Sequence, residues 1–208
     1  MYPHAIISGI DLSAKRIVQA SKAQTLENNL SVLSGNVYLM PFRDNCFDFV
    51  FSRLLFEYLK NPQKALSEMK RVCKTGGTIM VQDLDGQFSN NYPVDREIEN
   101  GWHNIFSQIQ KTGFDPDIGR KLFSFFYKEN LDNIDVKIEN YHLIAGKISL
   151  EDENYWKNKL SSVSETFPKY TSLKSEIVSE ISGNYLDYLR KAETISFSNL
   201  FTVYGVKK

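Results

Sequence analysis

The chain has 208 residues, enough for one domain with a sizeable hydrophobic core. Its 25 basic and 25 acidic residues cancel, and no long basic run is present, which argues against a protein that coats nucleic acid by neutralising phosphates. The two cysteines have no metal or redox spacing, so we expect no metal site and a reducing, cytoplasmic location. No stretch has the pattern of a membrane span or a signal peptide, so we expect no membrane association.

The first part of the chain alternates short apolar runs with amphipathic segments. Strands are expected at residues 5–10, 30–37, 47–51 and 78–83, and helices after Ser13, with Ile17 and Val18 on the apolar face, at 54–59 and at 62–73. Ser13 can cap the first helix, and Asn61 can cap the third, which has proline at its first position. Cys73 falls on the apolar stripe of that third helix, so we expect a small core residue. This alternation predicts an α/β fold with a parallel sheet.

Beyond residue 86 the pattern changes to longer helical segments. We expect helices at residues 96–111, 117–130, 151–165 and 173–192, and strands at 135–143 and 196–206.

Asp11 is the first candidate for ligand binding. It ends a predicted strand just before a helix, at the edge of a parallel sheet where ligands bind. A carboxylate in this place can accept hydrogen bonds from both hydroxyls of a ribose, or it can cap the helix without any ligand. Position alone leaves both roles open.

The candidates for proton transfer lie later in the chain. Asp83 ends a predicted strand and Asp85 lies in the turn after it, where they can act as a general base or close a turn on their own backbone. His142 falls near the end of another predicted strand and has a side chain suited to proton transfer near neutral pH. A lone histidine beside aromatic residues is more often packed than catalytic. Asp83 and His142 are therefore the catalytic candidates, with Tyr92 and Tyr141 as further polar aromatic residues.

Four segments of the chain form an informative combination. They are Gly9-Ile10-Asp11-Leu12-Ser13, Asn36-Val37-Tyr38-Leu39-Met40-Pro41-Phe42, Phe47-Asp48-Phe49-Val50-Phe51 and Arg71-Val72-Cys73-Lys74-Thr75-Gly76-Gly77. Together they resemble the middle of a class I S-adenosylmethionine-dependent methyltransferase of the small-molecule type. The resemblance implies a single Rossmann-like domain with a mostly parallel sheet and flanking helices. Residues 1–86 would form the cofactor half, residues 87–134 a helical insert, and residues 135–208 the remaining strands and helices.

The resemblance also implies roles for individual residues. Asp11 and Leu12 match the place that holds the ribose of S-adenosyl-L-methionine. The side chain of Asn36 and the amide of Val37 match the adenine contacts. Ser52 and Arg53 match residues that line the aminoacyl part of the cofactor, although Arg53 could instead pair with Glu57 one helical turn away.

The glycine-rich loop that precedes the Gly9 segment in this family is absent from the chain, so we expect an amino-terminally truncated fold. In the family, the strand that leads to this loop lies between the strands that match residues 5–10 and 47–50. One of three outcomes is expected: the two flanking strands close up, another chain or a second copy supplies the missing strand, or the chain is a shortened product of a longer gene.

Two functions follow as hypotheses. The first is S-adenosylmethionine-dependent methyl transfer to a small molecule, impaired by the absent motif. The second is a non-catalytic pseudo-methyltransferase or subunit that binds a partner chain. A nucleotide-sugar or dinucleotide enzyme shares the argument for Asp11, but the Met-Pro-Phe and Lys-x-Gly-Gly features are not typical of it.

Overall fold

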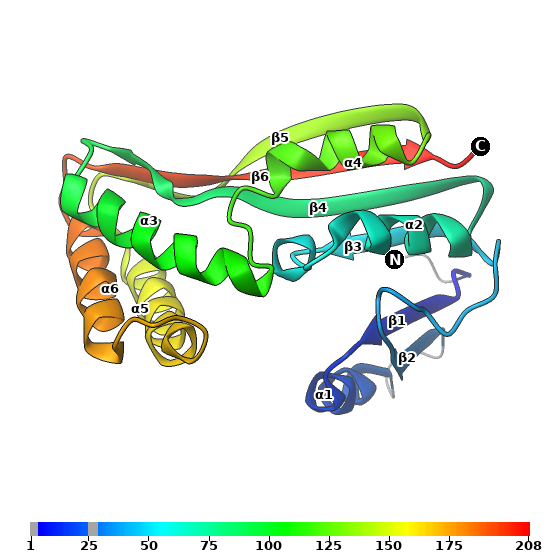
Figure 1. Ribbon diagram of the computed structural model, residues 1–208, viewed down its shortest axis with the longest axis horizontal. Coiled ribbons are helices and arrows are strands. Elements are labelled where there is room, and N and C mark those ends of the chain that lie inside the picture. The colour runs from blue at the N-terminus through cyan, green and yellow to red at the C-terminus, as the bar shows by residue number, and fades with distance from the viewer. Residues whose placement is uncertain (1–3, 25–28) are drawn as a thin grey trace.

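The computed structural model describes residues 4–24 and 29–208, which form two β-sheets with helices around them (Figure 1). The smaller sheet pairs β1 (Ile7–Asp11) with β2 (Leu30–Ser34) in parallel, and helix α1 (Ala14–Gln24) connects them. The larger sheet has the strand order β3-β4-β6-β5. Its strands are β3 (Phe47–Arg53), β4 (Cys73–Tyr92), β5 (Asp132–Ala145) and β6 (Ile195–Val206).

Strand β3 runs parallel to β4, whereas β6 runs antiparallel to both β4 and β5. The expected Rossmann-like α/β fold with flanking helices is therefore confirmed. Strands β1 and β3 are the neighbours of the strand that the family places between them, and they belong to separate sheets. Of the three expected outcomes, closure of the two flanking strands is thus not what the structure shows.

The main helices are α2 (Pro62–Val72), α3 (Arg96–Ile109), α4 (Leu122–Lys128), α5 (Leu150–Thr166) and α6 (Ser175–Leu189). Helix α2 begins as predicted, because the Asn61 side chain accepts a hydrogen bond from the N–H of Lys64 at 3.0 Å and Pro62 occupies the first turn. Its buried face consists of Ala65, Leu66, Met69 and Val72.

Three predicted boundaries were wrong. The helix expected at residues 54–59 is a single 3₁₀ turn, Phe56–Tyr58, because Leu54 adopts a left-handed φ of 52° that cannot start a helix. The strand expected at residues 78–83 extends over Cys73–Tyr92, since β6 pairs along most of its length. Cys73 is buried as expected, but it is the first residue of β4 rather than part of the helix.

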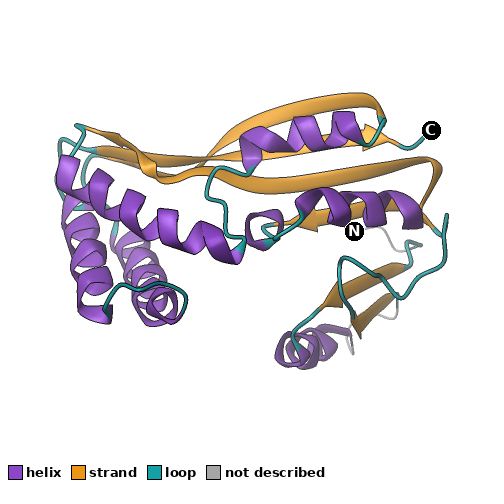
Figure 2. Cartoon of the chain, in the orientation of Figure 1, coloured by secondary structure: helices purple, strands orange, loops and turns teal. Residues whose placement is uncertain are grey.

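The buried side chains form two clusters. One lies between α2, α4 and the larger sheet and includes Leu66, Ile79 and Phe126. The other lies where α3, α5 and α6 gather at one end of the long sheet (Figure 2). At its centre, the rings of Phe88 and Trp102 stack with centroids 4.0 Å apart. The second cluster thus joins the expected helical insert to the carboxyl-terminal helices.

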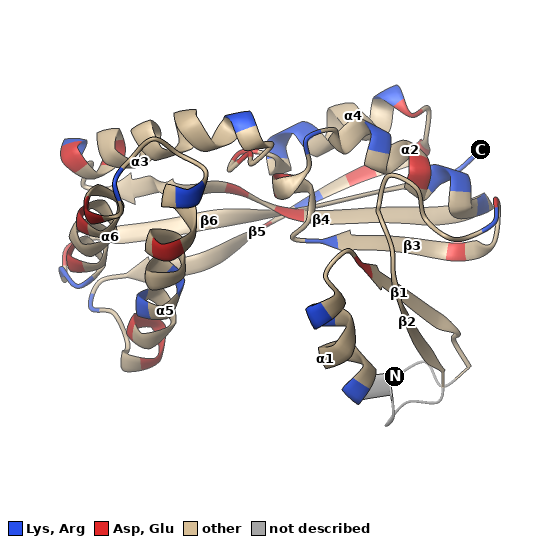
Figure 3. Cartoon of the chain, turned by 60° about the horizontal axis from the view of Figure 1, so that its bottom comes forward, with Lys and Arg blue, Asp and Glu red and all other residues tan. Residues whose placement is uncertain are grey.

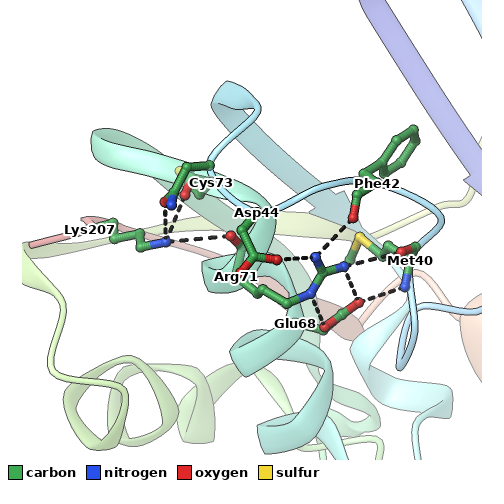
Figure 4. A network of polar contacts seen from close by, with 8 residues as sticks. Met40, Phe42, Asp44, Glu68, Arg71, Cys73 and Lys207 are labelled. Atoms are coloured by element: carbon green, nitrogen blue, oxygen red, sulfur yellow. Dashed lines mark hydrogen bonds and ion pairs between the residues drawn. The ribbon is translucent and has the colours of Figure 1, made fainter.

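Arg71 at the end of α2 binds the segment that connects the two sheets (Figure 4). Its Nη1 donates to the carbonyl oxygen of Phe42 at 2.9 Å and to the carboxylate of Asp44 at 2.6 Å. Its Nη2 donates to the carbonyl oxygen of Met40 at 3.1 Å and to Glu68 Oε1 at 2.7 Å. Because one guanidinium reaches two backbone carbonyls and two carboxylates, it fixes this connection to α2.

Replacement of Arg71 by glutamine should lower the free energy of unfolding by about 2 kcal/mol, because the shorter amide cannot reach the same acceptors and partly buried charged hydrogen bonds are lost. Urea denaturation measures this loss. The matched control is Arg43→Gln on the same connection, where the exposed arginine should tolerate the change within about 0.5 kcal/mol. Equal stabilities of the two variants would show that Arg71 does not hold the connection.

Candidate active site

A cavity of about 490 Å³ extends along β1 and β3 to their carboxyl ends. The residues for which a cofactor contact was predicted come from three separate segments, and all of them line this cavity: Asp11, Leu12, Asn36, Val37, Ser52 and Arg53. The carboxyl ends of neighbouring parallel strands are where α/β folds bind ligands. We call this space the first cavity.

The carboxylate of Asp11 caps helix α1 and also lines the first cavity. Its Oδ1 accepts a hydrogen bond from the N–H of Ser13 at 2.7 Å, and its Oδ2 lies 3.5 Å from Nη1 of Arg16. The side chain remains 34% exposed. A carboxylate has about four lone-pair sites, so the cap leaves acceptor capacity for a ligand. The two roles predicted for Asp11 are therefore compatible.

Asn36 forms a turn at the same edge. Its Oδ1 accepts a hydrogen bond from the N–H of Tyr38 at 2.9 Å, and its backbone forms an isolated bridge with Leu39. The side-chain oxygen predicted to bind adenine is thus also the oxygen that holds the turn. An amide oxygen has two lone pairs, so one of them is left for a ligand.

Ser52 and Arg53 end strand β3. The hydroxyl of Ser52 is buried and has no hydrogen-bond partner among the residues that the structure describes. Arg53 Nε donates to Oε1 of Gln82 at 2.8 Å, so its side chain contacts β4 rather than Glu57. The suggested Arg53–Glu57 pair was wrong, because Glu57 turns into the interior and Arg53 stays exposed. A buried hydroxyl without a partner at a cavity wall fits a polar ligand atom.

A second cavity of about 430 Å³ adjoins the first one. Arg16, Leu54 and Leu55 line both cavities. The polar residues of the second cavity come from the turn after β3, from β4, from β5 and from α5: Glu57, Tyr58, Gln87, Tyr141, His142, Tyr155 and Lys159. Two adjoining cavities can hold two molecules whose reacting atoms meet at the shared wall.

Glu57 is the buried acid of the second cavity, with a residue exposure of 3%. Burial and the neighbouring carboxylate of Asp83 raise its pKa from 4.5 to about 7. The Gln87 amide donates a hydrogen bond to its Oε2, which opposes that rise. A carboxyl with this pKa can both accept and release a proton near neutral pH.

Lys159 on α5 supplies the cation of the second cavity. Its Nζ lies 4.9 Å from the ring centroid of Trp156, 5.6 Å from that of Phe88 and 5.9 Å from that of Tyr155. Burial lowers its pKa from 10.5 to about 8, and the charge of Glu57 opposes this change. The second cavity therefore places the amine of Lys159 and the carboxyl of Glu57 beside aromatic rings.

His142, a catalytic candidate from the sequence, lines the second cavity. Its Nε2 lies 2.9 Å from the hydroxyl of Tyr155, and its Nδ1 is buried without a partner in the part of the chain that the structure describes. Burial and the charge of Lys159 lower its pKa from 6.5 to about 3. The imidazole is thus neutral at physiological pH and can orient a substrate or Tyr155 by hydrogen bonding.

Asp83, the other catalytic candidate, uses its carboxylate to bind backbone N–H groups. Its Oδ2 accepts hydrogen bonds from the N–H groups of Phe56 at 2.7 Å, Leu55 at 3.0 Å and Glu57 at 3.4 Å. It does not line either cavity. Asp83 therefore positions the turn that carries Glu57.

The other acidic and aromatic candidates lie apart from this site. Asp85 forms a two-pronged ion pair with Arg120, with Nη2 at 2.6 Å and Nε at 2.9 Å. Tyr92 is 70% exposed at the end of β4 and lines neither cavity.

Among residues 4–24 and 29–208, no cluster of histidine, cysteine and acidic side chains could hold a metal ion. None of the helices that the structure describes is long and apolar enough to cross a membrane.

Glu57, Gln87, Tyr155 and Lys159 were not singled out as site residues from the sequence. Each is a common residue type on a short turn, a strand or a helix, and no motif marks it. The apolar neighbours Leu54, Leu55 and Phe56 give the only local signal, since they surround a single acidic residue. Its burial became visible only in the folded chain.

Comparison with known proteins identifies the family. Residues 2–81 match the family model of a methyltransferase domain. The chain is 31% identical over 165 residues to an uncharacterized methyltransferase of Schizosaccharomyces pombe, covering 73% of this chain and 55% of that protein. It is 25% identical over 144 residues to a malonyl-[acyl-carrier protein] O-methyltransferase of Legionella pneumophila, covering 68% of this chain and 48% of that one. The chain thus spans about half the length of these curated relatives.

Solved structures share the fold. A phosphoethanolamine N-methyltransferase of Haemonchus contortus, in complex with phosphomonomethylethanolamine and S-adenosylhomocysteine, superposes with a TM-score of 0.57 at 16% identity, covering 98% of this chain and 44% of that one. A protein of Bacillus halodurans superposes with a TM-score of 0.56 at 13% identity, covering 97% of this chain and 83% of that one. The sequence matches show a methyltransferase domain at residues 2–81, and the solved structures show that the chain shares the fold of S-adenosylmethionine-dependent methyltransferases.

Glu57 should make the stability of the protein depend on pH. Its pKa is raised in the folded state, so the protonated carboxyl stabilises the fold. This stabilisation is complete below pH 4.5, which is the ordinary pKa of the group, and is lost as the pH rises through about 7. The difference in the free energy of unfolding between Glu57→Gln and the natural chain should therefore shift by about 3 kcal/mol in favour of the variant from the acidic to the alkaline end of this window. Urea denaturation across the pH range measures the difference between the two proteins.

Comparison with the Glu57 variant cancels the opposite contribution of His142, whose lowered pKa removes stability as the pH falls below 6.5. The control is Glu139→Gln on β5, an exposed glutamate whose replacement should change stability by no more than about 0.5 kcal/mol. A pH-independent difference for Glu57→Gln would mean that this carboxyl is not held in a buried site.

Proposed function

We propose that the chain catalyses methyl transfer from S-adenosyl-L-methionine to a small-molecule acceptor. The observation that carries the proposal is the pair of adjoining cavities that share Arg16, Leu54 and Leu55. The first cavity collects the residues that match cofactor contacts of the family, and the second contains buried acid and base groups. Methyl transfer requires such an arrangement, because donor and acceptor must be aligned for an in-line displacement.

The residues of the first cavity fit the adenosine part of the cofactor. The free acceptor sites of Asp11 suit the two ribose hydroxyls, and Asn36 with the N–H of Val37 suits the adenine edge. The unpartnered hydroxyl of Ser52 suits a polar atom of the aminoacyl part. The cofactor, when bound, supplies a methyl group activated by a sulfonium. The chain contributes binding and alignment.

The second cavity would hold the acceptor. Glu57, with a pKa of about 7, can take the proton that an acceptor hydroxyl or amine has to lose. Lys159 can pair with an anionic group of the acceptor, while the neutral imidazole of His142 and the hydroxyl of Tyr155 can orient it. The rings of Phe88, Tyr155 and Trp156 exclude water around the ammonium group.

The named relatives include an O-methyltransferase and an N-methyltransferase, so they support a small-molecule acceptor without favouring oxygen or nitrogen.

We also propose a cytoplasmic location, which the two free cysteines Cys46 and Cys73 support.

Asp11 gives the direct test of cofactor binding. Asp11→Asn keeps one side-chain oxygen to cap α1 but lacks the charged pair of oxygens for a ribose diol, so the affinity for S-adenosylhomocysteine should fall by about tenfold or more. Isothermal titration calorimetry measures the affinity. Ser13→Ala is the control, because it weakens the same helix start without removing a ligand contact.

Two results would contradict these assignments. Equal affinities of the natural chain and Asp11→Asn would overturn the ribose contact. The absence of any heat with the natural chain would argue against activity of the isolated chain and for a non-catalytic, partner-binding role.

A further inference from the structure

The ammonium group of Lys159 forms no hydrogen bond and no ion pair in the part of the chain that the structure describes. Its close contacts are with the faces of the three aromatic rings of Trp156, Phe88 and Tyr155. An ammonium group carries three N–H donors. The donors of Lys159 are therefore available to a ligand.

The aromatic rings leave one side of this ammonium group open. Lys159 lines the second cavity, whereas Phe88 and Trp156 do not. These two rings therefore cover the ammonium group on the side of the protein interior, and the second cavity adjoins its other side. Since a partly desolvated charge needs compensation, a negatively charged group in the second cavity would stabilise Lys159 in its charged form.

The second cavity has two basic residues, and only one of them has an acidic partner among the described residues. They come from α1 and α5, two helices that are both drawn below the larger sheet in Figure 3. Arg16 on α1 lies 3.5 Å from the carboxylate of Asp11. Lys159 on α5 is thus the cation that remains to be balanced by a ligand.

The walls of the second cavity suit a flat and largely apolar molecule. Apolar surface comes from three leucines: Leu54, Leu55 and Leu84. Aromatic surface comes from three tyrosines and a histidine: Tyr58, Tyr141, Tyr155 and His142. Aromatic rings pack well against such side chains, and the cavity of about 430 Å³ has room for a small aromatic molecule.

The protonation states of the second cavity favour a ligand with a single negative charge. Burial raises the pKa of Glu57 to about 7 and lowers the pKa of His142 to about 3, so both groups are mostly uncharged just below neutral pH. Burial also raises the pKa of Tyr58 and of Tyr155, so these hydroxyls stay neutral. One ammonium group then balances one negative charge, and a dianion would leave its second charge unpaired.

We propose that the second cavity binds a carboxylic acid with a flat, largely apolar body, and that the carboxylate of this acid pairs with the ammonium group of Lys159. A carboxylate is a monoanion that accepts charge-assisted hydrogen bonds from an ammonium group. That the acid is the methyl acceptor rests on the proposed function, whereas its binding does not. Because an ion-paired carboxylate is a weak nucleophile, it serves for recognition, and the methyl group goes to another atom of the acid near the wall of Leu54 and Leu55.

Isothermal titration calorimetry of the whole chain without any cofactor tests the proposal with naphthoate, a carboxylate on a flat aromatic body. We expect one naphthoate to bind per chain. Naphthamide has the same shape without the charge, so it should bind about tenfold or more weakly. Naphthyl phosphate, a dianion above neutral pH, distinguishes a carboxylate site from a phosphate site and should also bind about tenfold or more weakly.

Protein variants locate the charge that binds the acid. Lys159→Met removes the charge but keeps a side chain that packs on the same rings, so the affinity for naphthoate should fall by about tenfold or more while the affinity for naphthamide stays the same. Lys159→Arg keeps the charge and should keep the preference for naphthoate. The control is Lys157→Met on the same helix, where the lysine pairs with Glu153 at 2.8 Å, and it should leave both affinities unchanged. Circular dichroism checks that the variants fold.

The affinity for naphthoate should also fall as the pH rises. Glu57 becomes negatively charged as the pH rises through about 7, and Lys159 loses its proton as the pH rises through about 8. Both changes weaken the binding of an anion, so the affinity should drop by about tenfold or more between about pH 6 and pH 9, with no such change for naphthamide. Asp83 is bound by backbone N–H groups and lines neither cavity, so it does not contact the ligand.

Four results would overturn the proposal: equal affinities for naphthoate and naphthamide, tighter binding of naphthyl phosphate, unchanged naphthoate affinity of Lys159→Met, or a naphthoate affinity that does not fall with pH. If Lys159→Met loses both ligands, Lys159→Arg decides, since a retained preference for naphthoate supports the proposal and a lost preference overturns it. Titration of S-adenosylhomocysteine is a separate measurement. Naphthoate binding without cofactor binding would therefore contradict the proposed function alone, and the reverse result would contradict the carboxylic acid alone.

Discussion

The carboxylate of Asp83 connects the fold to the candidate active site. It lies fully buried in β4 and accepts hydrogen bonds from consecutive N–H groups of the turn after β3. A buried carboxylate is tolerated only when such donors compensate for its lost hydration. The turn is thereby fixed, with Leu54 and Leu55 as the wall between two cavities and Glu57 inside the second one. Burial raises the pKa of Glu57 and the charge of Asp83 adds to that rise, so Asp83 contributes to both the position and the proton affinity of this acid.

The two sheets are connected in a different way. Their strands do not pair, and the connection is made by the chain segment that Arg71 fixes to α2. The first cavity has two parts. At the carboxyl ends of β1 and β3 it is lined by the side chains predicted to bind the cofactor, and along the two strands it is lined by apolar side chains.

Local sequence was sufficient for most of the elements. Apolar periodicity predicted the six strands and the main helices, because the side that faces the core repeats with the geometry of each element. Asn61 and Pro62 marked the start of α2 correctly, since capping depends on neighbouring residues alone. The turn after β3 and the length of β4 were missed, because Asp83 and β6, far along the chain, determine them.

The sequence by itself determined the family and the edge of the sheet where Asp11, Asn36 and Ser52 gather, because strand ends and their order fix that edge. Only the tertiary structure decided the second cavity, where Glu57 and Lys159 come from different halves of the chain and acquire shifted pKa values through burial. It also decided that Asp83 positions a turn and that β1 and β3 stay apart. Burial and pairing depend on residues distant in sequence, and no local pattern contains them.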